Sequence, residues 1–249
     1  KKASQKYITF VDCDDTLDLD MYEVLMKYFE SGKYDIVHCG YKRIKDDKVI
    51  KEVNGTGKEY IQDNLQALEC LIDGRLFVGA LWNKIYKREL FNNIEFDENL
   101  KMNEDILVNY KVFNVSKKSI FIDISKYNYY ERSDSVCVST NDIRKCKDSL
   151  NVASKIYNDC KGTKLEGHAE DKYLNSLLNL YRCNYFNLNR GQHYNENKEL
   201  RIIILSYLKD NKFRSEKSKI SAMLLCYIPK IYKLIYKVYD RYRVPNWDV

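Results

Sequence analysis

Residues 7–17 read YITFVDCDDTL, an apolar run that ends in three carboxylates. Tyr7–Val11 consists mainly of β-branched and aromatic residues, which predicts a buried strand. Asp12 and Asp14 follow its carboxyl end, with Asp15 beside them. Two carboxylates so spaced are able to share a divalent cation where α/β folds bind ligands, and their hard oxygens suit Mg²⁺ or Mn²⁺. The alternative interpretation is a solvated acidic turn that only caps a helix.

Apolar periodicity and chain breakers outline the elements that follow. They predict helices over Met21–Glu30, Asn64–Ile72 and Glu104–Val115, and strands over Asp35–Tyr41 and Ser119–Ile124, the last extended by Tyr127–Tyr130. The polar stretch Lys42–Lys58 suggests a hairpin, and Leu81–Tyr86 starts an element that continues into a short helix, Lys87–Phe91. From about residue 141 helical periodicity dominates, over roughly 143–160, 168–188, 196–210 and 218–242. We therefore predict an α/β domain over 1–141 and a helical region over 142–249.

Composition narrows the class of protein. With 249 residues, 45% of them hydrophobic and 31% charged, the chain is expected to fold around a sizeable core. Eight cysteines without a CxxC pair predict free thiols in a reducing cytoplasm, and three scattered histidines argue against a zinc site. The start of the chain has no signal-peptide pattern, and no apolar run approaches the ~18 residues of a membrane span.

The net charge of +6 is concentrated near the end of the chain. Lys209–Arg243 holds ten basic against three acidic residues, so the remainder sums to about −1. Ile220–Tyr242 is basic and amphipathic with many tyrosines, which predicts that residues 218–243 dock on an anionic membrane surface, with a break or kink at Pro229. The alternative is a helix packed on the α/β domain. No nucleic-acid recognition motif accompanies the basic residues, so nucleic-acid binding is not expected. We expect a cytoplasmic protein, peripheral on the inner face of the membrane.

Two enzyme families use an acidic strand end of this kind. The string DxDxT at 12–16 resembles the haloacid-dehalogenase-like phosphatases, in which Asp12 would be the nucleophile and Asp14 the acid/base. Those enzymes also need a later acidic pair such as GDxxxD. No GDxxxD occurs in this sequence, which weighs against a phosphatase.

The chain more closely resembles the family 2 glycosyltransferases of the GT-A fold, over residues 1–140. The resemblance rests on motifs in the family's order: Tyr7–Asp15, Asp35–Tyr41, Leu81–Leu90 (LWNKIYKREL), Phe96–Asp105 (FDENLKMNED) and Tyr127–Ser135 (YNYYERSDS). It implies a partial GT-A-type mixed sheet flanked by helices, followed by the C-terminal helical region. It also implies transfer of a sugar from a nucleotide-diphosphate donor, such as a UDP-sugar, to a hydroxyl of a glycan or lipid-linked glycan, in surface polysaccharide biosynthesis.

The resemblance also implies roles for single residues. Asp14 would bind the Mn²⁺ or Mg²⁺ that bridges the donor diphosphate, while Asp12 would contact the ribose or a metal-bound water. Asp105 would be the base of an inverting single displacement, supported by Glu104. A carboxylate suits that role because it takes the proton late in the transition state.

Four further residues complete the predicted site. Trp82 and Asn83 are candidates for the acceptor pocket, because tryptophan stacks on sugar rings and asparagine both donates and accepts. Lys84 and Arg132 would meet phosphate oxygens of the donor. The alternatives are a core position for Trp82 and ordinary surface charge for the two basic residues.

The sequence departs from the family pattern at its start. Full-length members begin with a strand–helix–strand half that grips the nucleobase and ribose, and no such half precedes Lys1. We therefore expect residues 1–249 to bind nucleotide weakly, and micromolar UDP binding would contradict this. A non-catalytic binding domain that keeps the fold stays open as an alternative.

Overall fold

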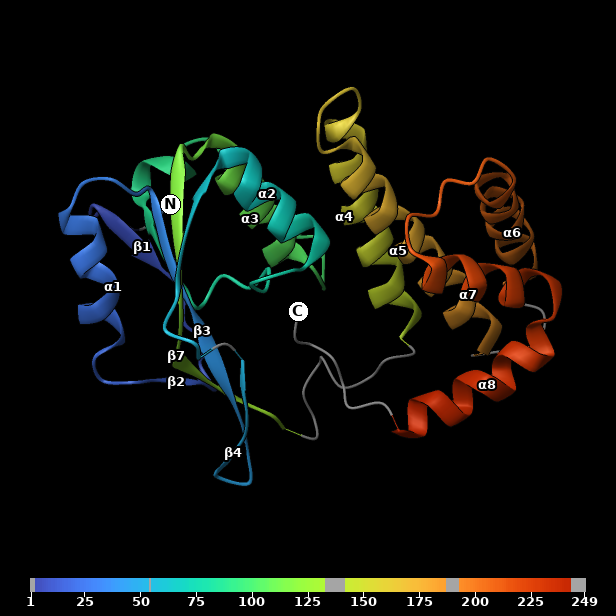
Figure 1. Cartoon of the computed structure of the whole chain (residues 1–249), viewed down its shortest axis with the longest axis horizontal. Coiled ribbons are helices and arrows are strands. Elements are labelled where there is room, and N and C mark those ends of the chain that lie inside the picture. The colour runs from blue at the N-terminus through green and yellow to red at the C-terminus, as the bar shows by residue number, and fades with distance from the viewer. Residues whose placement is uncertain (1–2, 54, 133–141, 187–192, 243–249) are drawn as a thin grey trace. The chain divides into compact units, whose positions relative to one another are not determined.

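The computed structural model describes residues 3–53, 55–132, 142–186 and 193–242, with side chains up to residue 239. The chain forms two compact units (Figure 1). One holds a sheet and its helices between Tyr7 and Tyr130, and the other holds the helices between Ile143 and Tyr242 together with the segment Asn99–Asn103. The domain boundary predicted at residue 141 and residue 243 of the predicted tail lie outside the described residues.

The first unit is built on a mixed sheet. Its strands are β1 (Tyr7–Thr9), β2 (Thr16–Leu17), β3 (Ile36–Lys45), β4 (Lys48–Val53), β5 (Glu59–Asp63), β6 (Lys84–Lys87) and β7 (Lys118–Tyr130). The main path runs β1-β6-β3-β7-β2, with β4 paired to β3 and β5 paired to β7. The strands β3 and β7 are parallel, and the other described pairs are antiparallel. This confirms the predicted mixed sheet.

Helices cover both faces of this sheet. The helix α1 (Met21–Glu30) lies on one side, and α2 (Asn64–Asp73) and α3 (Glu104–Val115) lie on the other (Figure 1). Alternation along β3 explains the two layers, because successive side chains of a strand point to opposite faces. Val37 and Cys39 pack in one core cluster with α1, whereas the ring of His38 lies against Phe77 and Phe113.

Local signals fix the ends of several elements. Asp63 begins α2 with a capping box to Gln66, and Gly74 ends the helix in the left-handed region at φ 64°. The expected hairpin within 42–58 is present, because Asp46 and Asp47 turn β3 into β4 at positive φ.

The observed elements differ from the predictions in several places. The first strand ends at Thr9 rather than Val11, since the chain turns away at the acidic residues. The strand β5 was not expected; it is held by its pairing with β7, which the local sequence does not show. The predicted helix over Lys87–Phe91 is a short 3₁₀ helix, η1 (Arg88–Phe91).

The second unit is helical, as predicted. Its elements are α4 (Ile143–Cys160), α5 (Glu166–Phe186), α6 (Tyr194–Lys209), α7 (Glu216–Tyr227) and α8 (Pro229–Tyr242). The break expected at Pro229 within 218–242 is confirmed and gives two helices, because Pro229 has no N–H to donate and begins a new helix after Ile228. Residues 187 and 188 of a predicted helix are outside the described range. No helix in the described part of the chain is long and apolar enough to span a bilayer.

Candidate active site

An acidic turn directly follows β1. This strand ends at Thr9, and the Asp15 N–H donates to the Asp12 carbonyl at 3.2 Å, which closes the turn. Carboxylate oxygens of Asp12, Asp14 and Asp15 all lie within 4.8 Å of one another. The structure therefore brings together the two predicted metal ligands and their neighbour.

The strand β7 holds this turn in place. The Tyr127 hydroxyl donates to Asp15 Oδ2 at 2.8 Å and accepts from the Asp12 N–H at 3.2 Å. The Tyr130 N–H donates to Asp15 Oδ1 at 2.9 Å. Both carboxylate oxygens of Asp15 thus accept hydrogen bonds from β7. Within the described residues no protein donor bonds to the carboxylate of Asp12 or Asp14, so both are available to a ligand.

The turn carries negative charge that the protein itself does not balance. Burial raises the pKa of Asp12, and the charges of Asp15, Asp14 and Glu104 raise it further. Burial also raises the pKa of Asp15, although its hydrogen bonds from Tyr130 and Tyr127 act in the opposite direction. Clustered carboxylates with raised pKa values are what a hard divalent cation stabilises. The donor set thus fits Mg²⁺ or Mn²⁺.

Glu104 and Asp105 open α3 at the edge of the same cluster. Burial raises the pKa of Asp105 to about 6, with further contributions from the charges of Glu104 and Asp12. The Leu81 N–H, at 3.4 Å from Asp105 Oδ2, acts against this rise. The charge of Asp12 raises the pKa of Asp105, and the charge of Glu104 raises the pKa of Asp12. The predicted base and the predicted metal ligands therefore share one electrostatic site.

Arg132 is the basic side chain that the structure places at this turn. Its Nη2 donates to the Asp14 carbonyl at 3.4 Å, and its charge lowers the pKa of Asp15. The side chain is exposed, so its guanidinium is able to contact an anion bound beside the turn. Residues 133–135 of the same motif lie outside the described part of the chain.

Lys84 does not lie where a donor diphosphate would bind. Its side chain is fully buried, and Nζ donates to Val78 O at 3.0 Å, Ala80 O at 2.7 Å and Asn83 Oδ1 at 2.7 Å. These three bonds use all its protons. Burial also lowers the pKa of Lys84 to about 7. The predicted phosphate contact is therefore corrected to an internal clamp on the 78–81 segment.

Trp82 and Asn83 are internal as well. The Trp82 ring stacks on Tyr127 at 4.1 Å between centroids and meets the edge of Tyr41 at 5.0 Å. Asn83 is 1% exposed, with its amide donating to the Cys39 carbonyl and its oxygen accepting from Lys84. Neither side chain presents a surface to an acceptor sugar, so the acceptor pocket predicted at these two residues is not found there.

Sequence reasoning missed the groups that position this site. Tyr127 links the acidic turn to Trp82, and Asn109 donates to Gly79 O at 2.7 Å and Ala80 O at 3.1 Å. The Tyr86 hydroxyl in turn donates to Asn109 at 2.7 Å. A polar residue inside the apolar stripe of a predicted helix was the available signal for Asn109. Tyr127 gave no such signal, because its partners come from distant strands.

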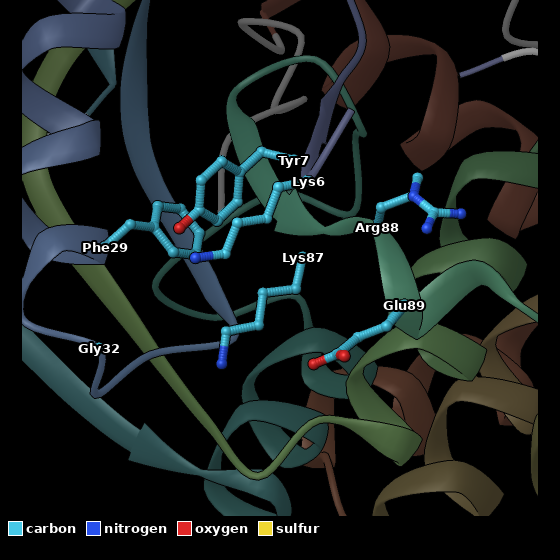
Figure 2. A pocket seen from close by; sticks show the side chains of 7 residues that line it. All are labelled: Lys6, Tyr7, Phe29, Gly32, Lys87, Arg88 and Glu89. Carbon is cyan, nitrogen blue, oxygen red and sulfur yellow. The ribbon is translucent and has the colours of Figure 1, made fainter. Parts of the chain in front are cut away.

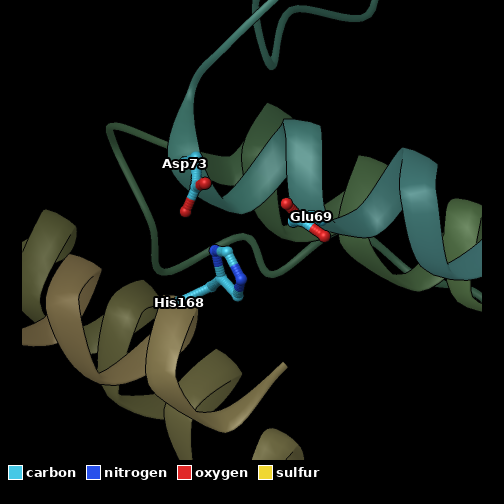
Figure 3. A group of neighbouring side chains, drawn as sticks. All are labelled: Glu69, Asp73 and His168. Carbon is cyan, nitrogen blue, oxygen red and sulfur yellow. The ribbon is translucent and has the colours of Figure 1, made fainter. Parts of the chain in front are cut away.

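Two other features of the first unit, a cavity and an acidic pair, lie away from the predicted site residues. A cavity of about 340 Å³ at the start of β1 is lined by Lys6, Tyr7, Phe29, Gly32, Lys87, Arg88 and Glu89 (Figure 2). Its Lys87 is already paired with Asp35 at 2.7 Å. Figure 3 shows Glu69 and Asp73 on α2, and both pair with Arg75. His168, also drawn there, belongs to α5 in the second unit.

A mixed sheet between helices, with an acidic turn after β1 and a carboxylate at the start of α3, is the arrangement of a GT-A-type fold. A family model described as "Glycosyl transferase family 2" matches residues 1–95. The first part of the chain is therefore similar to this family. The match includes the acidic turn and the Trp82–Lys84 segment but ends before Glu104 and Asp105.

Several glycosyltransferases are similar to the chain in sequence. Glycosyltransferase GlyA of Streptococcus pneumoniae is 31% identical over 140 residues, which is 53% of this chain and 20% of that protein. The uncharacterized glycosyltransferase EpsJ of Bacillus subtilis is 28% identical over 55% of this chain and 41% of its own length. The cholesterol galactosyltransferase of Borreliella burgdorferi is 27% identical over 84% of this chain and 62% of its own.

The fold also has solved counterparts. The S. aureus TarS 1–349 structure in complex with UDP-GlcNAc superposes with a TM-score of 0.60 at 18% identity, covering 97% of this chain and 70% of that one. The chain spans between about a fifth and about three fifths of the length of the three curated relatives named above.

Proposed function

We propose that the chain carries the metal and acceptor side of a sugar transfer from a nucleotide-diphosphate donor, such as a UDP-sugar, to a hydroxyl of a glycan or lipid-linked glycan. The observation that carries this proposal is the convergence of Asp12 and Asp14 with Asp105 in one site. The TarS structures, described as complexes with UDP-GlcNAc and with UDP, support a nucleotide-sugar donor. The names of the relatives support sugar transfer, and a role in surface polysaccharide synthesis is part of our proposal.

Asp14 and Asp12 are the residues that would hold Mg²⁺ or Mn²⁺. When bound, the cation would supply Lewis-acid stabilisation of the negative charge that gathers on the leaving diphosphate. The protein contributes a turn whose position is fixed by Tyr127 through Asp15. Arg132, exposed beside Asp14, adds a positive charge on the same side. Lys84 has no part in this contact.

Asp105 is the residue proposed to take the acceptor proton. Its raised pKa makes it a stronger base than an exposed aspartate, yet a pKa of about 6 still leaves it mainly ionised at pH 7. The Leu81 N–H bonds to one carboxylate oxygen, which orients the group. A single positioned base is enough for an inverting displacement, so we propose inversion at the sugar carbon.

The compartment follows from the donor and the thiols. Nucleotide sugars are cytoplasmic metabolites in the proposed chemistry, and Cys13, Cys39, Cys70 and Cys226 are thiols outside any disulfide. Free thiols in this number suit a reducing compartment. We therefore propose action in the cytoplasm, at the inner face of the cell membrane where a lipid-linked acceptor would be met.

The test is release of UDP from UDP-glucose, UDP-galactose and UDP-N-acetylglucosamine, each at millimolar concentration with Mn²⁺ and with water as the acceptor of the sugar. UDP release should occur with at least one donor and should fall sharply in Asp14→Asn and in Asp105→Asn. Equal release by the wild type and both variants would contradict the assignment of these carboxylates.

Two alternatives make different predictions. The family match over residues 1–95 weighs against the phosphatase, which would release phosphate from p-nitrophenyl phosphate with Mg²⁺. A non-catalytic binding domain would bind UDP and Mn²⁺ in a titration without releasing UDP from any donor.

A further inference from the structure

The helix α8 exposes a continuous row of aliphatic side chains. The exposed fractions are 52% for Ile231, 67% for Leu234, 49% for Ile235 and 55% for Val238. Spacings of three and four residues keep these side chains on one side of the helix. Their number and continuity distinguish them from the scattered apolar residues of an ordinary surface.

A different face of the same helix attaches it to its own unit. Tyr232 and Tyr236 are buried and lie against the ring of Phe186, at 6.1 Å and 5.2 Å between centroids. The Arg182 guanidinium lies 4.5 Å from the centre of the Tyr236 ring. Tyr232 and Tyr236 therefore anchor α8 to its unit, and the aliphatic row takes no part in this packing.

Basic side chains accompany the aliphatic row. Lys230 and Lys237 are exposed, and Lys233 is half-buried with Nζ 5.5 Å from the centre of the Phe186 ring. Between residues 217 and 239 the sequence has five lysines and no acidic residue. An apolar row bordered by one sign of charge matches the surface of an anionic bilayer, where the lysines meet headgroups and the aliphatic side chains enter the acyl boundary.

We propose that α8 lies in the plane of an anionic membrane surface and docks the chain on it through the aliphatic row, with Lys230, Lys233 and Lys237 contacting lipid phosphates. A second copy of the chain fits this face less well. In a two-fold dimer the same patch meets itself, so two sets of like-charged lysines would oppose each other. The inference concerns the second unit and does not depend on the sugar transfer.

The test is co-sedimentation of the 249-residue chain with vesicles of phosphatidylcholine alone or mixed with phosphatidylglycerol. We expect binding to the anionic vesicles, weakening as salt is raised. Changing Lys230, Lys233 and Lys237 to Gln should weaken it about a hundredfold, since each basic residue near an anionic surface contributes about a factor of five. The triple change Ile231→Gln, Leu234→Gln and Val238→Gln should weaken binding at least about tenfold while leaving the lysines in place.

Matched controls test whether vesicle binding depends on α8 or on any exposed aliphatic side chain. Val49→Gln, Ile50→Gln and Ile202→Gln alter side chains that are 55%, 49% and 59% exposed on other elements, and should bind vesicles like the wild type. Circular dichroism checks that each variant is folded. Equal vesicle binding by the α8 variants and the wild type would overturn the proposal. So would a dimer that the aliphatic substitutions dissociate in sedimentation velocity while no chain binds vesicles.

Discussion

The acidic turn after β1 and the buried segment Trp82–Lys84 both carry polar side chains in the order that the family resemblance requires, yet the fold uses them in opposite ways. The carboxylates of Asp12 and Asp14 stay at the surface with no protein donor in the described structure, so like charges accumulate there. Asn83 and Lys84 are buried, and their hydrogen bonds are made within the protein. The acidic turn destabilises the fold and is open to a ligand. In the segment Trp82–Lys84 the polar side chains are hydrogen-bonded and closed to solvent.

The difference teaches how the site is held together. Lys84 and Asn109 both donate to the Ala80 carbonyl, and the next residue, Leu81, donates its N–H to Asp105. The buried segment therefore orients the proposed base without touching a substrate. Substitutions in the two regions should accordingly separate activity from stability.

The largest expected effect is the loss of transfer in Asp14→Asn. Removing one of the two available carboxylates should lower the rate of UDP release about a thousandfold, because cation binding is worth several kcal/mol of transition-state stabilisation. The free energy of unfolding should stay within about 0.5 kcal/mol of the wild type, as for other surface changes. Asp47→Asn, an exposed aspartate in the β3–β4 turn, is the control and should leave both quantities unchanged. A stability loss as large as the activity loss would break the comparison.

The next effect belongs to the buried segment. Lys84→Met leaves the carbonyls of Val78 and Ala80 without the ammonium donor, and we expect the free energy of unfolding to fall by about 2 kcal/mol. Urea denaturation followed by tryptophan fluorescence measures it, since Trp82 is adjacent. Lys48→Met, on the exposed face of β4, should cost less than about 0.5 kcal/mol. Full stability in Lys84→Met would show that the clamp is dispensable.

The two regions also mark where the sequence sufficed and where it did not. Asp12 and Asp14 were found because a strand followed by clustered carboxylates is a local pattern. The burial of Trp82, Asn83 and Lys84 depends on α1, β3 and β7, which are far away in the chain. The motif therefore identified the right segment, but the side chains that it predicted to meet ligands are buried.

The same distinction holds for the fold. Helices such as α3 and α4 were predicted within a residue or two, because periodicity and capping are local. The strand β5 was missed because only its pairing with β7 stabilises it. The division of 218–242 at Pro229 was visible in the sequence as a break, although its consequence, a second helix with its own exposed face, needed the structure.

A third prediction uses pH to separate the activity of Asp105 from its cost to the fold. With a pKa of about 6, Asp105 is mostly protonated at pH 5 and mostly ionised at pH 7, so UDP release should rise about tenfold between these values. Stability should change in the opposite direction. An acid whose pKa is raised by folding favours the folded state while protonated, so this contribution is full below about pH 4 and is lost as the pH rises through 6.

Asp105→Asn serves as the matched variant for this experiment. Its free energy of unfolding should vary less between pH 4 and pH 6 than that of the wild type, measured by urea denaturation without divalent cation. A residual slope is expected from Asp12 and Asp15, whose pKa values are also raised. An identical slope in the variant and the wild type would show that Asp105 is not the group that titrates.

The smallest expected effect tests whether the acidic turn is destabilising until a cation arrives. Asp12→Asn removes one charge from a cluster in which Asp14, Asp15 and Glu104 all raise the pKa of Asp12. Without metal the variant should be more stable by about 0.5 kcal/mol, kept small because Asp12 is exposed and its repulsion is screened by solvent. Thermal unfolding should show this as a rise in Tm of about 1 to 2 °C. Millimolar Mn²⁺ should then reverse the order, since a cation that binds only the folded wild type stabilises it by mass action. If Mn²⁺ stabilised both proteins equally, Asp12 would not be a ligand, and the turn would be acidic for another reason.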